Sequence, residues 1–223
     1  MGPTINPRVK ICCIASSEEA SLAIRYGASA IGLVSAMPSG PGPISEDLIA
    51  EIAKTIPPPV ASFLLTSRQD ARSIIAQQKK CGTNTIQLCD AIKDETYDEL
   101  RDAMPGVALV QVIHVLGPES VDEALRAAPH VNAILLDSGN PALAVKVLGG
   151  TGRPHDWKIS RKIREVVSIP LFLAGGLTPE NVSRAISEVG PFGVDVCSGV
   201  RTSQRLDEEK LSKFFQEIGS KTN

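Results

Sequence analysis

A thiol near one end of this sequence and two glycine-containing turns near the other are the features best suited to chemistry. Cys12 closes a short apolar run, where a thiol can serve as a base or nucleophile. Gly175-Gly176 and Ser198-Gly199 each follow an apolar run and precede a helical pattern. Glycine lets backbone N–H groups approach a phosphate closely, so two such turns are better evidence than one. Together these features indicate an enzyme for a small sugar phosphate, although a single glycine turn can simply join a strand to a helix.

Short apolar runs alternate with amphipathic segments along the whole chain, which predicts eight strand–helix units. Eight units in 223 residues fit an α/β fold, a single-domain (β/α)8 TIM barrel covering residues 1–223, with 1–8 as a loose lead-in. A doubly wound open sheet is the alternative, but such sheets usually have fewer strands. We expect strands near residues 9–14, 29–34, 59–64, 85–88, 108–113, 131–137, 169–174 and 193–198. We expect helices near residues 17–27, 45–55, 68–81, 94–103, 119–128, 157–167, 179–189 and 207–218.

The ends of these strands carry further polar groups, and in such barrels the C-terminal strand ends hold the chemistry. Alternation along the first strand places Lys10 and Cys12 inside the barrel and Cys13 toward the helices. Gln87 lies near the end of the fourth strand, and Asp137 closes the sixth. On sequence alone, Cys12 can also be a small buried filler, and Asp137 can be a cap for the following turn.

Two more features belong to the same end of the predicted barrel. Asp195 shares an inward position on the last strand with Cys197 and can support the site from there. Gly149, Gly150 and Gly152 form a glycine cluster in the long connection after the sixth strand. Such a segment suits a loop that folds over a bound ligand, although it can equally be a plain connection.

The composition limits the classes of partner. The chain has 23 basic and 25 acidic residues and a formal net charge of -2, which gives no reason to expect nucleic acid or a membrane surface. No apolar run approaches the roughly 20 residues that span a bilayer, and no segment resembles a signal peptide, so we expect a cytoplasmic protein. The five cysteines lack the spacing of a disulfide framework and are expected to be reduced.

The residues at these positions resemble those of the phosphoribosylanthranilate isomerase family. The similar segments, in the family's order and spacing, are residues 10–12, 136–138, 149–152, 156–157, 172–182 and 193–200. The resemblance implies a (β/α)8 barrel of tryptophan biosynthesis. It would catalyse an Amadori rearrangement of N-(5-phosphoribosyl)anthranilate to 1-(2-carboxyphenylamino)-1-deoxyribulose 5-phosphate.

The resemblance also implies roles for individual residues. Asp137 would be the general acid that opens the ribose ring, and Cys12 the general base that removes the C2′ proton. No metal or organic cofactor is implied. The partner would be a small-molecule phosphoribosyl amine, and the protein a monomer or homodimer. From the strand ends and the resemblance, the residues expected to bind the substrate and its phosphate are Lys10, Gln87, Gly150, Gly152, Gly175, Gly176, Asp195, Ser198 and Gly199.

Three departures from the family concern the part of the site that would contact the aromatic acid of the substrate. The family has a Ser-Pro-Arg segment whose arginine pairs with the anthranilate carboxylate, whereas this chain has Gly42 in place of the arginine. The fourth strand ends in Cys89-Asp90, where the family has His-Gly. An inward-facing Asp90 would repel a substrate carboxylate. Cys13 stands where the family has glycine.

Several functions therefore stay open. The substrate can be phosphoribosylanthranilate, with Arg153 or Arg201 restoring the carboxylate clamp, or another N-phosphoribosyl amine without that carboxylate. A non-catalytic sugar-phosphate-binding barrel is a further alternative, although binding alone needs neither Cys12 nor Asp137. A thiol-based metal or redox site at Cys12 and Cys197 has the least support, because no zinc-like spacing accompanies them.

Overall fold

Eight parallel strands alternate with eight α-helices in the part of the chain that the structure describes. The strands are β1 (Arg8–Ile11), β2 (Ala30–Val34), β3 (Ala61–Thr66), β4 (Thr85–Leu88), β5 (Ala108–His114), β6 (Ala133–Asp137), β7 (Leu171–Leu173) and β8 (Gly193–Val196). The helices are α1 (Ser17–Arg25), α2 (Glu46–Thr55), α3 (Ala71–Cys81), α4 (Asp94–Ala103), α5 (Ser120–Ala127), α6 (Trp157–Val166), α7 (Val182–Val189) and α8 (Glu208–Gly219). Short 3-10 turns η1 (Ala128–His130) and η2 (Ser198–Val200) and a hairpin of β9 (Arg201–Thr202) and β10 (Arg205–Leu206) complete the elements.

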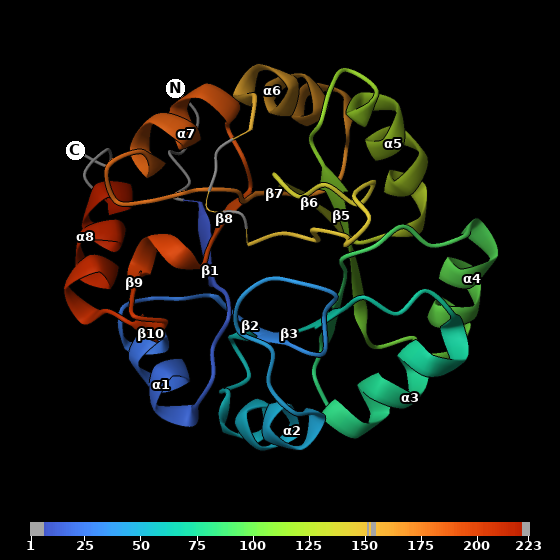
Figure 1. The fold of residues 1–223 in the computed structure, drawn as a ribbon, viewed down its shortest axis with the longest axis horizontal. Helices are drawn as coiled ribbons and strands as arrows, with labels where there is room; N and C mark the ends of the chain where they lie inside the picture. The colour runs from blue at the N-terminus through green and yellow to red at the C-terminus, as the bar shows by residue number, and fades with distance from the viewer. Residues whose placement is uncertain (1–6, 151, 153–154, 220–223) are drawn as a thin grey trace.

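The strands close into a barrel in sequence order, and β8 pairs in parallel with β1 through four residue pairs. Figure 1 shows the helices as an outer ring around the strands. This computed structural model describes residues 7–150, 152 and 155–219. The lead-in predicted for residues 1–8 lies outside the described residues except for Pro7 and Arg8, and Arg8 already belongs to β1. The predicted fold class is confirmed, and the open sheet is wrong.

Side-chain alternation divides the apolar residues into two layers. On β2, Ile31 and Leu33 pack beneath the helices, whereas Ala30 and Val34 lie in the barrel interior. Burial of a Leu or Ile side chain contributes about 1.5–3 kcal/mol, so the larger outer layer holds the helices against the barrel. The interior layer includes Cys12, Phe63, Leu65, Val110, Val112, Leu135 and Phe172.

Helix boundaries follow local capping. Ser16, Ser45, Asp70 and Asp156 each accept a hydrogen bond from a backbone N–H of the first turn of α1, α2, α3 and α6, which satisfies a donor that the helix cannot. Gly82, in the left-handed region at φ +66°, ends α3.

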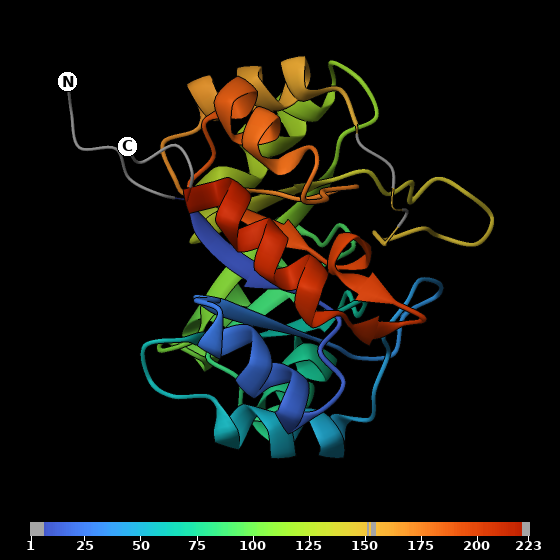
Figure 2. The same ribbon diagram turned by 90° about the vertical axis from the view of Figure 1, so that its left-hand side faces the viewer.

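The largest differences from the predicted boundaries are three residues, at the end of β1 and at the starts of α3 and α7. The first strand ends at Ile11 instead of residue 14, because Cys13 has a φ of +61°, in the left-handed region that no strand residue adopts. Helix α7 begins at Val182 instead of residue 179, since Pro179 and Glu180 form a turn. The β9–β10 hairpin was not predicted. Figure 2 shows it on the same side of the barrel as the yellow loop that follows β6.

Candidate active site

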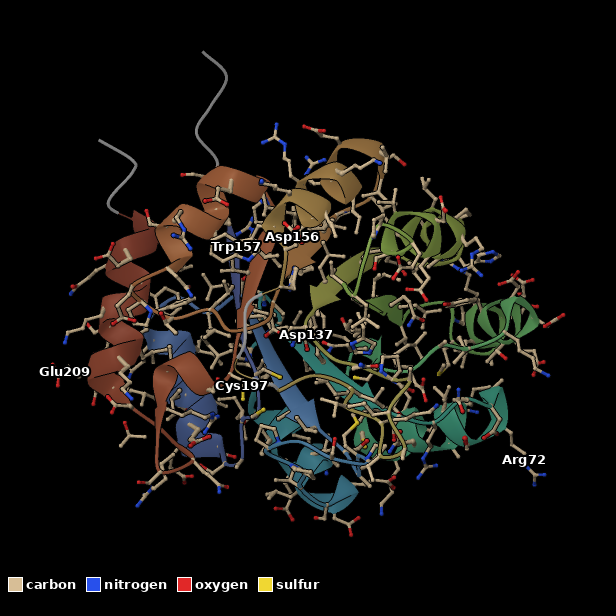
Figure 3. The ribbon with its side chains drawn as sticks, turned by 45° about the horizontal axis from the view of Figure 1, so that its top comes forward. Arg72, Asp137, Asp156, Trp157, Cys197 and Glu209 are labelled. Carbon is tan, nitrogen blue, oxygen red and sulfur yellow. The ribbon has the colours of Figure 1, made fainter. Side chains whose placement is uncertain are left out.

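A pocket opens at the C-terminal ends of the strands. It contains about 680 Å³ of space not filled by protein atoms, open solvent at its mouth included. Of the predicted site residues, those that line it are Cys12, Gln87, Asp137, Gly150, Gly152, Gly175, Gly176, Asp195 and Ser198. Figure 3 shows Asp137 and Cys197 toward the centre of the ring, whereas Arg72 and Glu209 lie at its outer edge.

A buried ion pair lies beneath the pocket. Lys10 has no exposed surface, and its Nζ donates to Asp195 Oδ2 at 2.9 Å. Burial works to lower the pKa of Lys10, but the charges of Asp195 and Cys12 raise it above its ordinary value, so the ammonium keeps its proton. Burial also raises the pKa of Asp195, against the opposing charge of Lys10. Gly32 leaves the necessary room, since a Cβ there would lie 3.1 Å from Lys10 Nζ.

Cys12 follows β1 and faces the pocket, as the strand alternation predicted. A side-chain hydrogen bond with Cys13 and the charge of Lys10 lower the pKa of Cys12, although burial opposes them. A lowered pKa favours the thiolate, which is the form that accepts protons. The thiol is buried, and a Cβ at Gly32 would lie 3.0 Å from its Sγ.

Cys13 does not face the helices, so that prediction was wrong. Its left-handed backbone turns the side chain into the pocket, where its Sγ lies 2.6 Å from Cys197 Sγ. The hydrogen bonds with Cys12 and Cys197, together with burial, raise the pKa of Cys13 well above its usual range. The premise that neighbouring strand residues face opposite ways does not apply, because β1 has already ended at Ile11.

The departure at Gly42 is coupled to Cys13. Gly42 has a φ of +83°, and a Cβ at this position would lie 2.6 Å from Cys13 Cβ and 3.1 Å from its Sγ. Any side chain at position 42 would therefore collide with Cys13. The family's arginine cannot stand here while Cys13 keeps this conformation.

Arg201 is not free to replace that arginine. Its side chain is 7% exposed, and its Nη1 donates to Glu19 Oε1 at 3.1 Å. Its Nη2 donates to the carbonyl oxygens of Cys12 and Cys13 at 3.2 and 2.6 Å. Arg201 thus holds the backbone after β1 and does not reach a substrate carboxylate. The other candidate, Arg153, lies outside the described residues.

Asp137, at the end of β6, lines the pocket and also caps the next turn, so the two alternatives posed by the sequence coexist. Its Oδ1 accepts from Ser138 N–H at 2.7 Å. His155 and Asp137 both lie next to Gly175. The position that a Cβ would take there is 3.0 Å from His155 Nδ1 and 3.2 Å from Asp137 Oδ1. Burial lowers the pKa of His155, against the charge of Asp137, and so favours the neutral imidazole beside the carboxyl group. His155 was not predicted as a site residue.

The two glycine turns come together at one side of the pocket. Gly175 and Gly176 have φ values of +81° and +64°. Asn181 holds their turn, since its Oδ1 accepts from Thr178 N–H at 2.9 Å and its Nδ2 donates to Gly176 O at 2.9 Å. Because α7 begins later than predicted, the residues that line the pocket just after β7, Gly175 and Gly176, belong to a turn and not to the helix N-terminus. Asn181 was missed as a site residue, although an Asn just before a helix is a recognisable capping signal.

Gly199 joins the second turn to the first. It does not line the pocket, and a Cβ there would collide with the carbonyl oxygen of Leu177. Ser198, which does line the pocket, begins the 3-10 turn η2. A residue without a side chain at position 199 is therefore required to pack the β7 and β8 turns against each other.

Two loops meet across the mouth of the pocket. Ser39 Oγ, after β2, donates to Lys146 O, after β6, at 2.8 Å. Lys146 Nζ also pairs with Asp90 Oδ2 at 2.5 Å. Asp90 is buried and does not line the pocket, so its charge is neutralised by Lys146 and not directed at a ligand.

The described residues contain no group of three or more His, Cys, Asp or Glu side chains placed to hold a metal ion. Among the described helices, none is both long and apolar enough to cross a membrane.

Comparisons with known proteins agree on one family. The family model for N-(5'phosphoribosyl)anthranilate (PRA) isomerase matches residues 9–217. N-(5'-phosphoribosyl)anthranilate isomerase 2 of Methanosarcina mazei is 37% identical over 209 residues, which cover 93% of this chain and 92% of the relative. The isomerase of Methanosarcina acetivorans is 33% identical, over 96% of this chain and 94% of its own length.

Solved structures of phosphoribosyl anthranilate isomerases superpose on this chain. The phosphoribosyl anthranilate isomerase of Thermotoga maritima superposes with a TM-score of 0.80 at 29% identity, over 96% of this chain and 99% of that one. A phosphoribosyl anthranilate isomerase in complex with reduced 1-(o-carboxyphenylamino)-1-deoxyribulose 5-phosphate gives a TM-score of 0.77 at 27% identity, over 96% and 99% of the two chains. Another structure describes the Thermotoga maritima protein as dimeric.

Proposed function

This chain belongs to the N-(5'-phosphoribosyl)anthranilate isomerase family, and we propose that it catalyses that family's Amadori rearrangement with Asp137 as general acid and Cys12 as general base. The observation that carries the proposal is the placement of a carboxyl group and an activated thiol in one pocket, beside two paired glycine turns. A protein that only bound the sugar phosphate would need neither group.

The substrate phosphate would sit against the turns that carry Gly175, Gly176 and Ser198. Their backbone N–H groups and the Ser198 hydroxyl donate hydrogen bonds to phosphate oxygens, and Asn181 holds the first turn in shape. Phosphate binding positions the ribose ring over the floor of the pocket. There Asp195 Oδ1 and Gln87 Oε1, which have no hydrogen-bond partner within the described residues, can accept from sugar hydroxyls.

Ring opening is the first chemical step. Asp137, as the general acid, donates a proton to the ring oxygen, so that the C1′–O bond breaks and the nitrogen lone pair forms an iminium ion. The imidazole of His155, which burial keeps neutral, adds no positive charge beside the carboxyl group that gives up the proton. The positive nitrogen makes the neighbouring C2′ proton acidic.

Cys12 performs the second step. Its thiolate removes the C2′ proton, and the electrons of that bond move to form the enolamine, which then tautomerises to the ketone. The Cys13 hydrogen bond and the Lys10 charge favour the thiolate near neutral pH. Asp195 balances the Lys10 charge, which keeps the ammonium buried.

The monomer or homodimer expected from the sequence stays a prediction for this chain.

One observation favours a second substrate. The described residues that line the pocket include neither Lys nor Arg, so no bidentate partner for an anthranilate carboxylate is among them. An N-phosphoribosyl amine without that carboxylate would fit the same chemistry. Apolar side chains such as Met37 and Leu148 line the pocket and suit an aromatic ring.

Turnover of two substrates tests both proposals. Phosphoribosylanthranilate is generated in situ and followed by its loss of fluorescence, and N-(5-phosphoribosyl)aniline, which lacks the carboxylate, is followed by chromatography. We expect the wild-type protein to convert phosphoribosylanthranilate. Conversion of the aniline compound alone would show that the substrate is an N-phosphoribosyl amine without the carboxylate. A folded protein that converts neither would contradict the isomerase proposal.

A further inference from the structure

Two thiols at the edge of the pocket lie closer together than unbonded atoms normally do. The Sγ atoms of Cys13 and Cys197 are 2.6 Å apart. This distance is nearer to the ~2.05 Å of a disulfide bond than to the ~3.5–4.0 Å at which carbon atoms make van der Waals contact. A shift of a few tenths of an ångström would bring them to bonding distance.

The backbone around the pair keeps them in this position. Cys13 adopts the left-handed region at φ +61°, which is strained for a residue other than glycine. Arg201 Nη2 holds it there by donating to Cys13 O at 2.6 Å. Cys12 N–H donates to Val196 O at 2.9 Å and fixes the register between the two segments. The approach of the two sulfurs is therefore built into the barrel and does not depend on a free loop.

The pair is also reachable by a small molecule. Cys197 is half-buried and lines the same pocket as Cys13, whereas the other two cysteines that line it, Cys12 and Cys89, are buried. Cys197 is therefore the more exposed of the two thiols to a reagent that enters the pocket.

We propose that Cys13 and Cys197 are a reversible thiol-oxidation site that forms an intramolecular disulfide by exchange with a small-molecule disulfide, RSSR. The Cys197 thiolate attacks one sulfur of RSSR, which forms a Cys197–S–S–R mixed disulfide and releases RS⁻. The Cys13 sulfur then attacks Cys197 Sγ, which forms the Cys13–Cys197 bond and releases a second RS⁻. The two protons of the protein thiols leave as two RSH, so RSSR is reduced by two electrons and the protein is oxidised by two.

Oxidation has a consequence for the base that rests on the proposed function. In the reduced protein, the hydrogen bond with Cys13 is the largest influence lowering the pKa of Cys12. The disulfide takes away that thiol proton, so the Cys12 thiolate loses its donor. We expect the acid limb of kcat/KM to move to higher pH on oxidation, with about a tenfold loss below the limb for each unit of displacement.

The bond itself is tested without any substrate. The full chain is equilibrated with mixtures of oxidised and reduced glutathione, and its thiols are then alkylated and counted. We expect three of the five cysteines to stay alkylatable in the oxidised form. Trypsin should release a linked pair of peptides, residues 11–25 joined to residues 185–201, that dithiothreitol separates.

Three variants identify the partners. The linked peptides should persist in Cys12→Ala, which assigns the bond to Cys13, and should be absent from Cys13→Ser and Cys197→Ser. The pH profile of Cys197→Ser should be the same with glutathione disulfide and with dithiothreitol. A linked pair that disappears in Cys12→Ala, a bond between Cys12 and Cys13, or five free thiols at every glutathione ratio would overturn the proposal. Because the mapping needs no turnover, it stands or falls separately from the isomerase activity.

Discussion

Replacement of Gly42 by alanine should be unusually costly, because the side chain of Cys13 fills the space beside it. Gly42 has a φ of +83°, where a residue with a Cβ loses about 1–2 kcal/mol. The new Cβ would also lie 2.6 Å from Cys13 Cβ, and overpacking of this kind costs about 1–3 kcal/mol. The two effects predict that Gly42→Ala lowers the free energy of unfolding by roughly 2–5 kcal/mol, measured by urea denaturation.

A neighbouring glycine separates the two effects. Gly40 has a φ of +104°, but the nearest atom to a Cβ there is Gly149 O at 3.6 Å, so Gly40→Ala should lose only the backbone part, about 1–2 kcal/mol. In a Cys13→Gly background the packing part of the Gly42→Ala loss should vanish, which gives a coupling energy of about 1–3 kcal/mol. If the Gly42→Ala loss equals that of Gly40→Ala, or is the same with and without Cys13, the steric argument fails.

Three more perturbations follow from the site. Asp195→Asn leaves Lys10 buried without its partner and should cost about 3–5 kcal/mol of unfolding free energy in urea; wild-type stability would show that the pair is not ionised. Since the thiolate of Cys12 is the base, kcat/KM should rise with pH through a pKa below that of an ordinary thiol. Lys10→Met should move this rise to higher pH, and an unchanged pH profile would show that Lys10 does not lower the pKa of Cys12. Gly199→Ala pushes a Cβ against Leu177 O and should raise KM more than it lowers kcat, because it separates the two phosphate turns; a change in kcat alone would contradict that role.

The sequence predicted most of the fold because each element had a local cause. The helices that follow Ser45 and Asp207 were marked by these capping residues, and the apolar strands by their alternation with amphipathic segments. Helix α7 was placed too early because the Thr178-Pro179 pair is a valid helix start, yet here the Asn181 side chain bonds back to the turn. Local propensity does not say which of two neighbouring starts the tertiary structure selects.

The candidate site was predicted in its parts but not in its contacts. Strand alternation placed Lys10 and Cys12 correctly, because both belong to or directly follow a regular strand. It misplaced Cys13, since a left-handed residue is visible in sequence only when it is glycine, asparagine or aspartate. The role of Arg201 in holding the backbone after β1 also could not be predicted, because it depends on contacts between residues almost two hundred positions apart.

The central claim is that Cys12 and Asp137 carry the isomerisation. Turnover of phosphoribosylanthranilate by Cys12→Ala and Asp137→Asn tests it most directly, beside the controls Cys81→Ala and Asp122→Ala, which remove the same groups far from the pocket. We predict at least a 10²-fold loss of kcat in each site variant, with retained affinity for reduced 1-(o-carboxyphenylamino)-1-deoxyribulose 5-phosphate and near-normal turnover in both controls. Wild-type turnover by either site variant would contradict the account.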